Sequence, residues 1–188
     1  GTTISLDFPT TTGAFQTELD TQDAYVAKFD MSKTTPELAY ATFLGGSGSE
    51  RANSIALEGG LAFVTGETDS FDFPTEDEIN DVDAFVVKLN ENGSDLLYSR
   101  VIGGSETLGE ADDYGYAIDV ENGASYVTGI TYSTNFPTTN GSTNQREGDT
   151  FIVKLHSNGD IDYSILYATK YLEGGYALAV KNGTAWVT

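Results

Sequence analysis

The 188-residue chain contains no cysteine, one histidine and one methionine. The absence of cysteine excludes disulfides and a thiol nucleophile. A single histidine argues against a zinc site of the usual type and against most Ser-His-Asp triads. No apolar run approaches 18 residues, so we expect no membrane insertion. The first residue is Gly1 and no signal-peptide pattern follows it, which we interpret as a mature or excised piece of a longer protein.

Basic residues are also scarce: nine Lys and Arg stand against 29 Asp and Glu, for a formal net charge of -20. This charge would repel nucleic acids and anionic membrane surfaces, so neither is expected as a partner. The histidine, His156, precedes the turn sequence Ser157-Asn158-Gly159 and is interpreted as a solvated turn residue. We therefore predict no catalytic residue and no enzyme. A glycan hydrolase with paired carboxylates stays open as a third alternative, because acidic residues are abundant.

The chain is rich in glycine (21), tyrosine (11) and phenylalanine (10), a composition that favours β structure. The sequence also repeats itself. Taking the threonine before a recurring glycine as the marker, Thr65, Thr128 and Thr188 divide the chain into three units, 1–65, 66–128 and 129–188. In each unit the recurring glycine stands seven residues before the phenylalanine of a Phe-Pro-Thr corner.

Each unit carries a strand that is apolar on both faces, at residues 23–29, 83–89 and 149–155. We expect such a strand to be buried on both sides, so its sheet must lie between two neighbours. The aspartate that opens each strand, Asp23, Asp83 or Asp149, is interpreted as a turn or backbone-capping group. The other predicted strands are the returning strands 38–44, 96–102 and 162 to about 172, the strands 54–57, 117–120 and 177–180, and the aromatic strands around Phe63, Tyr126 and Trp186.

Four antiparallel strands per unit, joined by tight turns and buried on both faces, are typical of a propeller blade. The predicted fold is therefore all-β, with three four-stranded antiparallel propeller-type blades. Propellers have about four to eight blades, so three do not close a ring. We expect a ring or array that is completed by other copies or by missing chain.

Four segments carry a likeness to a known family: the string Tyr-Ala-Thr-Phe-Leu-Gly-Gly-Ser-Gly at 40–48, then 63–68, 72–75 and 83–89. Together they resemble the SBBP-type β-propeller repeat of bacterial and archaeal secreted proteins. The likeness covers nearly the whole chain in three copies, of which the third is degenerate around 165–176. The resemblance implies an extracellular or cell-surface protein of a prokaryote, often modular, and brings no shared catalytic motif.

The two ends of the chain read as halves of one strand, because residues 184–188 joined to residues 1–6 match the two internal aromatic strands and their continuations. We predict a junction between copies formed by Gly1, Thr2, Thr3, Trp186, Val187 and Thr188. The predicted function is a structural, extracellular repeat protein that self-associates head to tail in a filament or scaffold, or in a ring. The alternative is a fragment of a larger propeller that acts as a carbohydrate- or protein-binding module.

Two kinds of modification or ligand site are suggested by local sequence. Glu110, Asp112 and Asp113 are weak candidates for Ca²⁺, with Asp77, Glu78 and Asp81 as a second group, although neither group has the spacing of a calcium loop. Ca²⁺ is the only cofactor that the sequence suggests. Three Asn-Gly-Ser/Thr sequons, at Asn92, Asn140 and Asn182, are candidate sites for glycans, but a hairpin turn would equally favour Asn-Gly.

Overall fold

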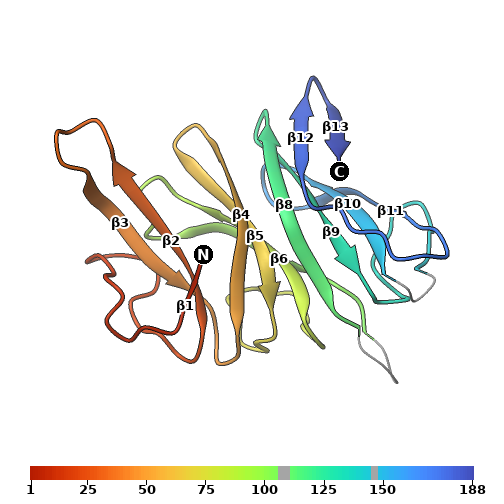
Figure 1. Ribbon diagram of the computed structural model, residues 1–188, viewed down its shortest axis with the longest axis horizontal. Coiled ribbons are helices and arrows are strands. Elements are labelled where there is room, and N and C mark those ends of the chain that lie inside the picture. The colour runs from red at the N-terminus through yellow and green to blue at the C-terminus, as the bar shows by residue number, and fades with distance from the viewer. Residues whose placement is uncertain (106–110, 145–147) are drawn as a thin grey trace.

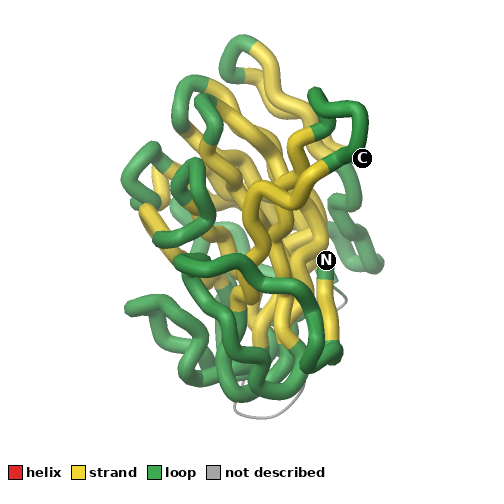
Figure 2. Tube along the Cα trace, turned by 90° about the vertical axis from the view of Figure 1, so that its left-hand side faces the viewer, coloured by secondary structure: helices red, strands yellow, loops and turns green. Residues whose placement is uncertain are grey.

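The computed structural model describes residues 1–105, 111–144 and 148–188, and within these ranges every regular element is a β-strand (Figures 1 and 2). The strands are β1 (Thr2–Thr3), β2 (Asp23–Asp30), β3 (Glu37–Leu44), β4 (Glu50–Glu58), β5 (Leu61–Thr68), β6 (Asp83–Leu89), β7 (Leu96–Ile102), β8 (Asp113–Glu121), β9 (Ala124–Thr131), β10 (Asp149–Leu155), β11 (Ile161–Tyr167), β12 (Leu178–Lys181) and β13 (Thr184–Val187). The all-β fold predicted from the composition is confirmed.

The strands form antiparallel sheets in chain order. Two sheets have four strands, β4-β5-β6-β7 and β8-β9-β10-β11, and they are flanked by a three-stranded sheet, β1-β2-β3, and a two-stranded sheet, β12-β13. The expectation of three four-stranded units is thus met only twice among the described residues. The reason is the hairpin between β4 and β5, which makes β4 the first strand of the second sheet, although its residues fall in the unit 1–65. The marker residues Thr65 and Thr128 therefore lie inside β5 and β9.

Three two-residue hairpin turns join β4 to β5, β8 to β9 and β12 to β13. Gly59-Gly60, Asn122-Gly123 and Asn182-Gly183 all have positive φ angles, between 53° and 83°. Two consecutive positive φ angles give the type I′ geometry that matches the twist of the flanking strands, and Gly and Asn tolerate it best. The predicted turns are confirmed, and they set the register of each first strand pair.

The sheets stack side by side along the chain (Figure 1). β2 packs against β4, β8 packs against β4 and β5, and β12 packs against β8. Strand β6 is buried along its whole length, with Phe85 and Val87 in one apolar core and Ala84 and Val86 in the next. This confirms for β6 the prediction that the central strand is covered on both faces, since successive side chains point to opposite sides. For β2 the prediction holds only in part, because the end of the strand is uncovered and Phe29 is 56% exposed.

The phenylalanine of each Phe-Pro-Thr corner packs on the third residue of a central strand. The ring centroids are 5.1 Å apart for Phe73 and Phe85 and 4.9 Å apart for Phe136 and Phe151, and both pairs are stacked. In the first sheet the corresponding contact, from Phe8 to Tyr25, is 4.5 Å and tilted. Phe73 and Phe136 are buried by these contacts and Phe8 is half-buried, so each long connection is tied to its sheet.

The third returning strand is shorter than predicted. It ends at Tyr167 rather than near residue 172, because the chain leaves the sheet there and crosses to β12. The pairing also identifies the counterpart of Tyr40, for which Tyr163 and Tyr167 are both candidates in the sequence. Tyr163 pairs with Lys154 as Tyr40 pairs with Lys28, so Tyr163 is the counterpart.

Candidate functional site

The two incomplete sheets at the chain ends together hold the strands of one complete sheet, and we call them the split sheet: β12-β13 at the C-terminus and β1-β2-β3 at the N-terminus. In the second sheet, β6 pairs with β5 over its whole length, from Asp83 to Leu89. In the first sheet, β2 pairs with β1 only at Asp23 and Ala24, and Gly1 adds bonds to Tyr25. Along the remainder of β2, the edge opposite β3 pairs with no strand among the described residues.

The registers show which residues correspond. Thr2 and Thr3 pair with Ala24 and Asp23, just as Glu67 and Thr68 pair with Ala84 and Asp83. Trp186 and Val187 pair with Ala179 and Leu178 of β12, as Phe63 and Val64 pair with Ala56 and Ile55 of β4. Strand β13 therefore corresponds to the first half of β5 and β1 to the second half. By this correspondence, the end of β13 and the start of β1 match the two sides of the Thr65–Gly66 peptide bond.

Hydrogen-bond alternation shows which amides lie on the free edge. Gly1 and Tyr25 exchange both backbone bonds, at 2.9 and 3.2 Å. In an antiparallel strand every second residue faces the same neighbour, so Ala27 and Phe29 point their N–H and C=O groups to the same side as Tyr25. On β13, Thr188 exchanges bonds with Ala177 at 3.1 Å, so the N–H of its neighbour Val187 faces away from β12.

Large apolar side chains are uncovered at both ends. Phe29 is 56% exposed, whereas Leu89, at the same position of the second sheet, is fully buried. Trp186 is 56% exposed, whereas its counterpart Phe63 is buried. On β4, Leu57 is 70% exposed, because no first strand of a preceding sheet covers it. Exposed aromatic and aliphatic side chains gathered on two matching edges are typical of an interaction surface.

Two grooves run between the free edge of β2 and the face of β4. One, of about 240 Å³, is lined by Gly1, Val26, Phe29 and Ile55 among others. The other, of about 460 Å³, includes Val26, Phe29, Ile55 and Leu57 in its lining. A first strand and the first half of a second strand would occupy this space in a complete sheet.

A lysine between two aromatic rings recurs in the complete sheets. Lys88 Nζ lies 5.0 Å from the ring centroid of Phe63 and 5.7 Å from that of Tyr98. Lys154 lies 5.6 Å from Tyr126 and 5.8 Å from Tyr163. These distances suit cation–π attraction.

In the split sheet, Lys28 lies 6.0 Å from the Tyr40 ring. The other ring, at the position of Phe63, would be Trp186, which is at the opposite end of the chain. The split sheet therefore holds all three members of this arrangement, but divides them between the two termini.

The hydrogen-bond partners of one carboxylate are also separated from it, at the opposite end of the chain. Glu50 Oε1 accepts hydrogen bonds from the hydroxyls of Thr68 and Ser70. The counterpart of Glu50 is Glu173, whose Oε2 is buried and has no hydrogen-bond partner among the described residues. The counterparts of Thr68 and Ser70 are Thr3 and Ser5, and Ser5 N–H already donates to Thr3 Oγ1 at 3.0 Å, as Ser70 does to Thr68 at 3.1 Å.

Consecutive sheets are also joined by a carboxylate at the end of each first strand. Glu58 accepts the N–H groups of Asn122 and Gly123, and Glu121 accepts those of Asn182 and Gly183. The counterpart in β12 is Lys181, which cannot accept such bonds. The last sheet therefore lacks this link.

The two described members of the first group predicted as weak Ca²⁺ ligands, Asp112 and Asp113, accept hydrogen bonds from different protein groups. Asp112 accepts the Tyr114 hydroxyl at 2.6 Å, Asp113 is buried and accepts the Gly104 N–H at 2.7 Å, and Glu110 lies outside the described residues. In the parts of the chain that are described, no group of three or more His, Cys, Asp or Glu could hold a metal ion.

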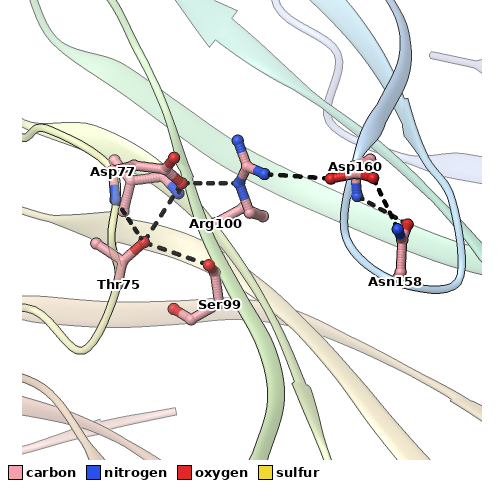
Figure 3. Close-up of polar contacts among 7 residues, drawn as sticks. Thr75, Asp77, Ser99, Arg100, Asn158 and Asp160 are labelled. Atoms are coloured by element: carbon pink, nitrogen blue, oxygen red, sulfur yellow. Dashed lines mark hydrogen bonds and ion pairs between the residues drawn. The ribbon is translucent and has the colours of Figure 1, made fainter.

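In the second predicted group, Asp77 is occupied by protein partners. Its Oδ2 accepts Arg100 Nε at 2.8 Å and the Val101 N–H at 2.9 Å (Figure 3). Arg100 also approaches Asp160 of the β10–β11 turn, at 3.9 Å. This chain of contacts links the second and third sheets and explains Asp77 without a metal.

The three sequon asparagines, Asn92, Asn140 and Asn182, are exposed in turns. His156 is exposed as well, with Nε2 3.6 Å from the carboxylate of Asp162. Neither observation assigns chemistry to these residues.

Sequence reasoning missed the surroundings of the aspartates that open the central strands. Asp23, Asp83 and Asp149 are fully or almost fully buried. A capping role holds in part, since Asp83 accepts the Asn80 N–H and Asp149 the Thr169 N–H, both at 3.3 Å. The recurrence of a second acid at Glu50, Asp113 and Glu173 was the signal that could have revealed their partners.

No family model matches the chain, and no curated protein matches it. The described residues contain no helix of a length and apolarity that would cross a membrane.

Proposed function

We propose that this chain is a structural, extracellular repeat protein of β-propeller type whose copies join head to tail. In this proposal each four-stranded sheet is a propeller blade. The split sheet becomes a blade when β12-β13 of one copy meets β1-β2-β3 of the next. The extracellular or cell-surface setting is inferred from the sequence resemblance, and no catalytic residue is part of the proposal.

The observation that carries the proposal is the matching register of β13 and β1. If β13 of one copy continued the line of β1 in another, Val187 would pair with Ala27, Trp186 with Lys28 and Ala185 with Phe29. These are the pairings of Val64, Phe63 and Ala62 with β6. Edge amides on both strands would be satisfied, which favours association because unpaired strand edges readily accept a further strand.

Side chains support the same pairing. Burial of Phe29, Trp186 and Leu57 would remove apolar surface from water, which is the main driving force for association. Trp186 would cover Lys28 from the side opposite Tyr40. The hydroxyls of Thr3 and Ser5 would reach the buried Glu173 Oε2, an oxygen that is costly to leave unpaired.

Each contact joins the C-terminal strands of one copy to the N-terminal strands of the next. Because these two surfaces differ, the contact is heterologous. It gives a ring if the rotation closes and a fibre if it does not. Each copy supplies two complete blades and the two parts of a third. Two copies would therefore give six blades, within the range of about four to eight known for propellers, whereas three copies would exceed it.

The test is the mass and shape of the purified 188-residue chain, measured by light scattering and electron microscopy. We expect closed pairs or longer fibres, and dissociation on substituting Val187→Pro, because proline removes the N–H that faces away from β12. The matched control is Val187→Thr, which keeps that N–H and the branched β-carbon, and should assemble. A monodisperse wild-type monomer at high concentration, or a Val187→Pro variant that assembles like the wild type, would contradict the proposal.

A further inference from the structure

Two carboxylates from neighbouring sheets meet in the protein interior. Asp83 opens β6 and Asp113 opens β8, and the Asp113 N–H donates to the Val82 carbonyl at 2.7 Å, which holds the two strand starts together. Both side chains are almost completely buried. Asp83 Oδ1 and Asp113 Oδ2 both lie within 2.8 Å of one point, where a Cβ would stand on Gly103. Asp83 Oδ1 lies 1.7 Å from that point, so the absence of a side chain at Gly103 makes room for the Asp83 carboxylate.

The hydrogen bonds of the pair are incomplete. Asp113 Oδ2 accepts the Gly104 N–H and the Ser133 hydroxyl, both at 2.7 Å. Among the described residues, Asp83 Oδ2 accepts only the Asn80 N–H, at 3.3 Å. Oδ1 of each carboxylate is buried and has no partner at hydrogen-bond geometry in the part of the chain that the structure describes, although the nearby Thr131 hydroxyl favours the ionised form of Asp113 and lowers its pKa. Buried carboxylate oxygens without a partner are costly, so such a group needs a proton or a cation.

No basic side chain compensates the pair: the ion pairs found among the described residues involve neither aspartate. Burial, the largest cause, and the charge of Asp113 together raise the pKa of Asp83 to about 7, and burial raises the pKa of Asp113 to about 6. Above those values two negative charges would face each other without a counter-ion.

The same arrangement recurs between the first and second sheets. Asp23 opens β2 and Glu50 opens β4, the Glu50 N–H donates to the Gln22 carbonyl at 2.8 Å, and both carboxylates are fully buried. Asp23 Oδ1 and Glu50 Oε2 lie within 2.7 Å of the Cβ position of Gly45, and Asp23 Oδ1 has no hydrogen-bond partner among the described residues. The pair is therefore a repeated part of the fold.

The third repeat differs at the position of the glycine. Tyr167 pairs with Thr150 as Ile102 pairs with Ala84, so Ala168 stands where Gly103 stands in the second sheet. A Cβ therefore stands in the third repeat at the point that the Asp83 and Asp113 oxygens approach in the second. Asp149 and Glu173 are present in this repeat, beside an alanine where the other two repeats have glycine.

We infer that each of the two carboxylate pairs with a glycine beside it, Asp83 with Asp113 and Asp23 with Glu50, binds a Ca²⁺ ion between adjacent sheets. All available donors are oxygens, which are the ligands of hard cations. Ca²⁺ accepts irregular sets of carboxylate, hydroxyl and carbonyl oxygens, whereas Mg²⁺ requires near-octahedral geometry and keeps its waters. The ion neutralises the pair and ties consecutive sheets together. This inference does not depend on association between copies.

The experiment is calorimetric titration of CaCl₂ into the full chain after EDTA treatment, at about pH 8, with thermal unfolding followed in parallel. We expect saturable binding of two Ca²⁺ ions per chain and a rise of the melting temperature with Ca²⁺ concentration. Because the chain has a net charge of -20, MgCl₂ at the same concentration serves as the control for general screening.

Two matched variants assign the sites. Asp83→Asn keeps the shape of the side chain and should bind one Ca²⁺, whereas Asp149→Asn, at the equivalent position of the third repeat, should still bind two. Gly103→Ala places a methyl group between the carboxylates and should also bind one, with circular dichroism to verify folding. If the pairs instead share a proton, the wild type shows no saturable Ca²⁺ binding. That result, or two ions bound to a folded Asp83→Asn variant, overturns the inference.

Discussion

Lys88 pairs directly with Phe63 across β5 and β6, and its ammonium group lies 5.0 Å from the centre of the Phe63 ring. Lys154 and Tyr126 repeat the relationship in the third sheet. The third instance would be Lys28 with Trp186, two residues that stand at opposite ends of the chain. This relationship gives the sharpest test of how the two ends meet.

Cross-linking should therefore detect the pairing of β13 with β2. A Lys28→Cys chain mixed with a Trp186→Cys chain should form a disulfide-linked heterodimer under mild oxidation, because directly opposed residues outside the hydrogen-bonded pairs bring their side chains closest. The native chain has no cysteine, so each variant alone has no suitable partner thiol. Non-reducing electrophoresis measures the product.

The register control for this experiment is Thr184→Cys, two residues away on the same side of β13. Mixed with Lys28→Cys it should give little heterodimer. Equal yields from Trp186→Cys and Thr184→Cys would contradict the proposed register.

Lys181 should be the residue that limits the strength of the junction. Glu58 and Glu121 each accept two N–H groups from the next hairpin turn, and Lys181 stands at their position. The substitution Lys181→Glu should tighten association, since it would let this position accept the N–H groups of Gly59 and Gly60 in a second copy. Analytical ultracentrifugation measures the dissociation constant.

The control is Lys33→Glu, which changes the net charge equally but lies in the exposed loop between β2 and β3. It should weaken association or leave it unchanged. If Lys181→Glu behaves like Lys33→Glu, the carboxylate link plays no part at the junction.

Two equivalent positions differ in burial, so truncating their side chains should change the free energy of unfolding by very different amounts. Leu89→Ala should lower the free energy of unfolding by about 2–5 kcal/mol, because it leaves a cavity in a closed core. Phe29→Ala should change it by about 0.5 kcal/mol or less in the unassociated chain, because Phe29 is largely exposed there. Urea denaturation in the Val187→Pro background measures both. A large loss for Phe29→Ala would show that the free chain already covers β2.

The buried carboxylates predict how stability depends on pH in the absence of Ca²⁺. Burial raises the pKa of Asp83 to about 7 and those of Asp23 and Asp113 to about 6, from an ordinary value of 3.8. The neighbouring acids Asp81 and Asp112 raise the pKa of Asp83 as well. The folded chain therefore binds more protons than the unfolded chain between about pH 4 and pH 7.

Since stability falls with pH wherever the folded state holds more protons, the unfolding midpoint in urea should decrease from about pH 4 to about pH 7. The exposed carboxyl of Asp162, whose pKa is lowered by Lys154, changes stability only at pH values below this range. Asp83→Asn should flatten the decrease, because an amide does not titrate, and saturating Ca²⁺ should oppose it in the wild type. A midpoint that rises over this range would contradict the assignment.

The succession of strands and turns along the chain could be predicted from its residues alone. The period of the apolar segments, the paired Gly and Asn residues at the turns and the Phe-Pro corners all act over a few neighbouring residues, so they specify strands and hairpins without further context. The likeness of Trp186–Thr188 and Gly1–Thr3 to the two halves of one internal strand was visible for the same reason, because each half matches the internal strands residue by residue.

Only the tertiary structure decided which residues meet across sheets. Asp83 looks like a capping residue in sequence, and its burial against Asp113 depends on two strands 30 residues apart that start side by side. The distinction between Tyr163 and Tyr167 depended on pairing with Lys154. Phe29 and Leu89 have equivalent positions in sequence, yet one is exposed and the other buried, because burial is set by the neighbouring strand and not by the residue itself.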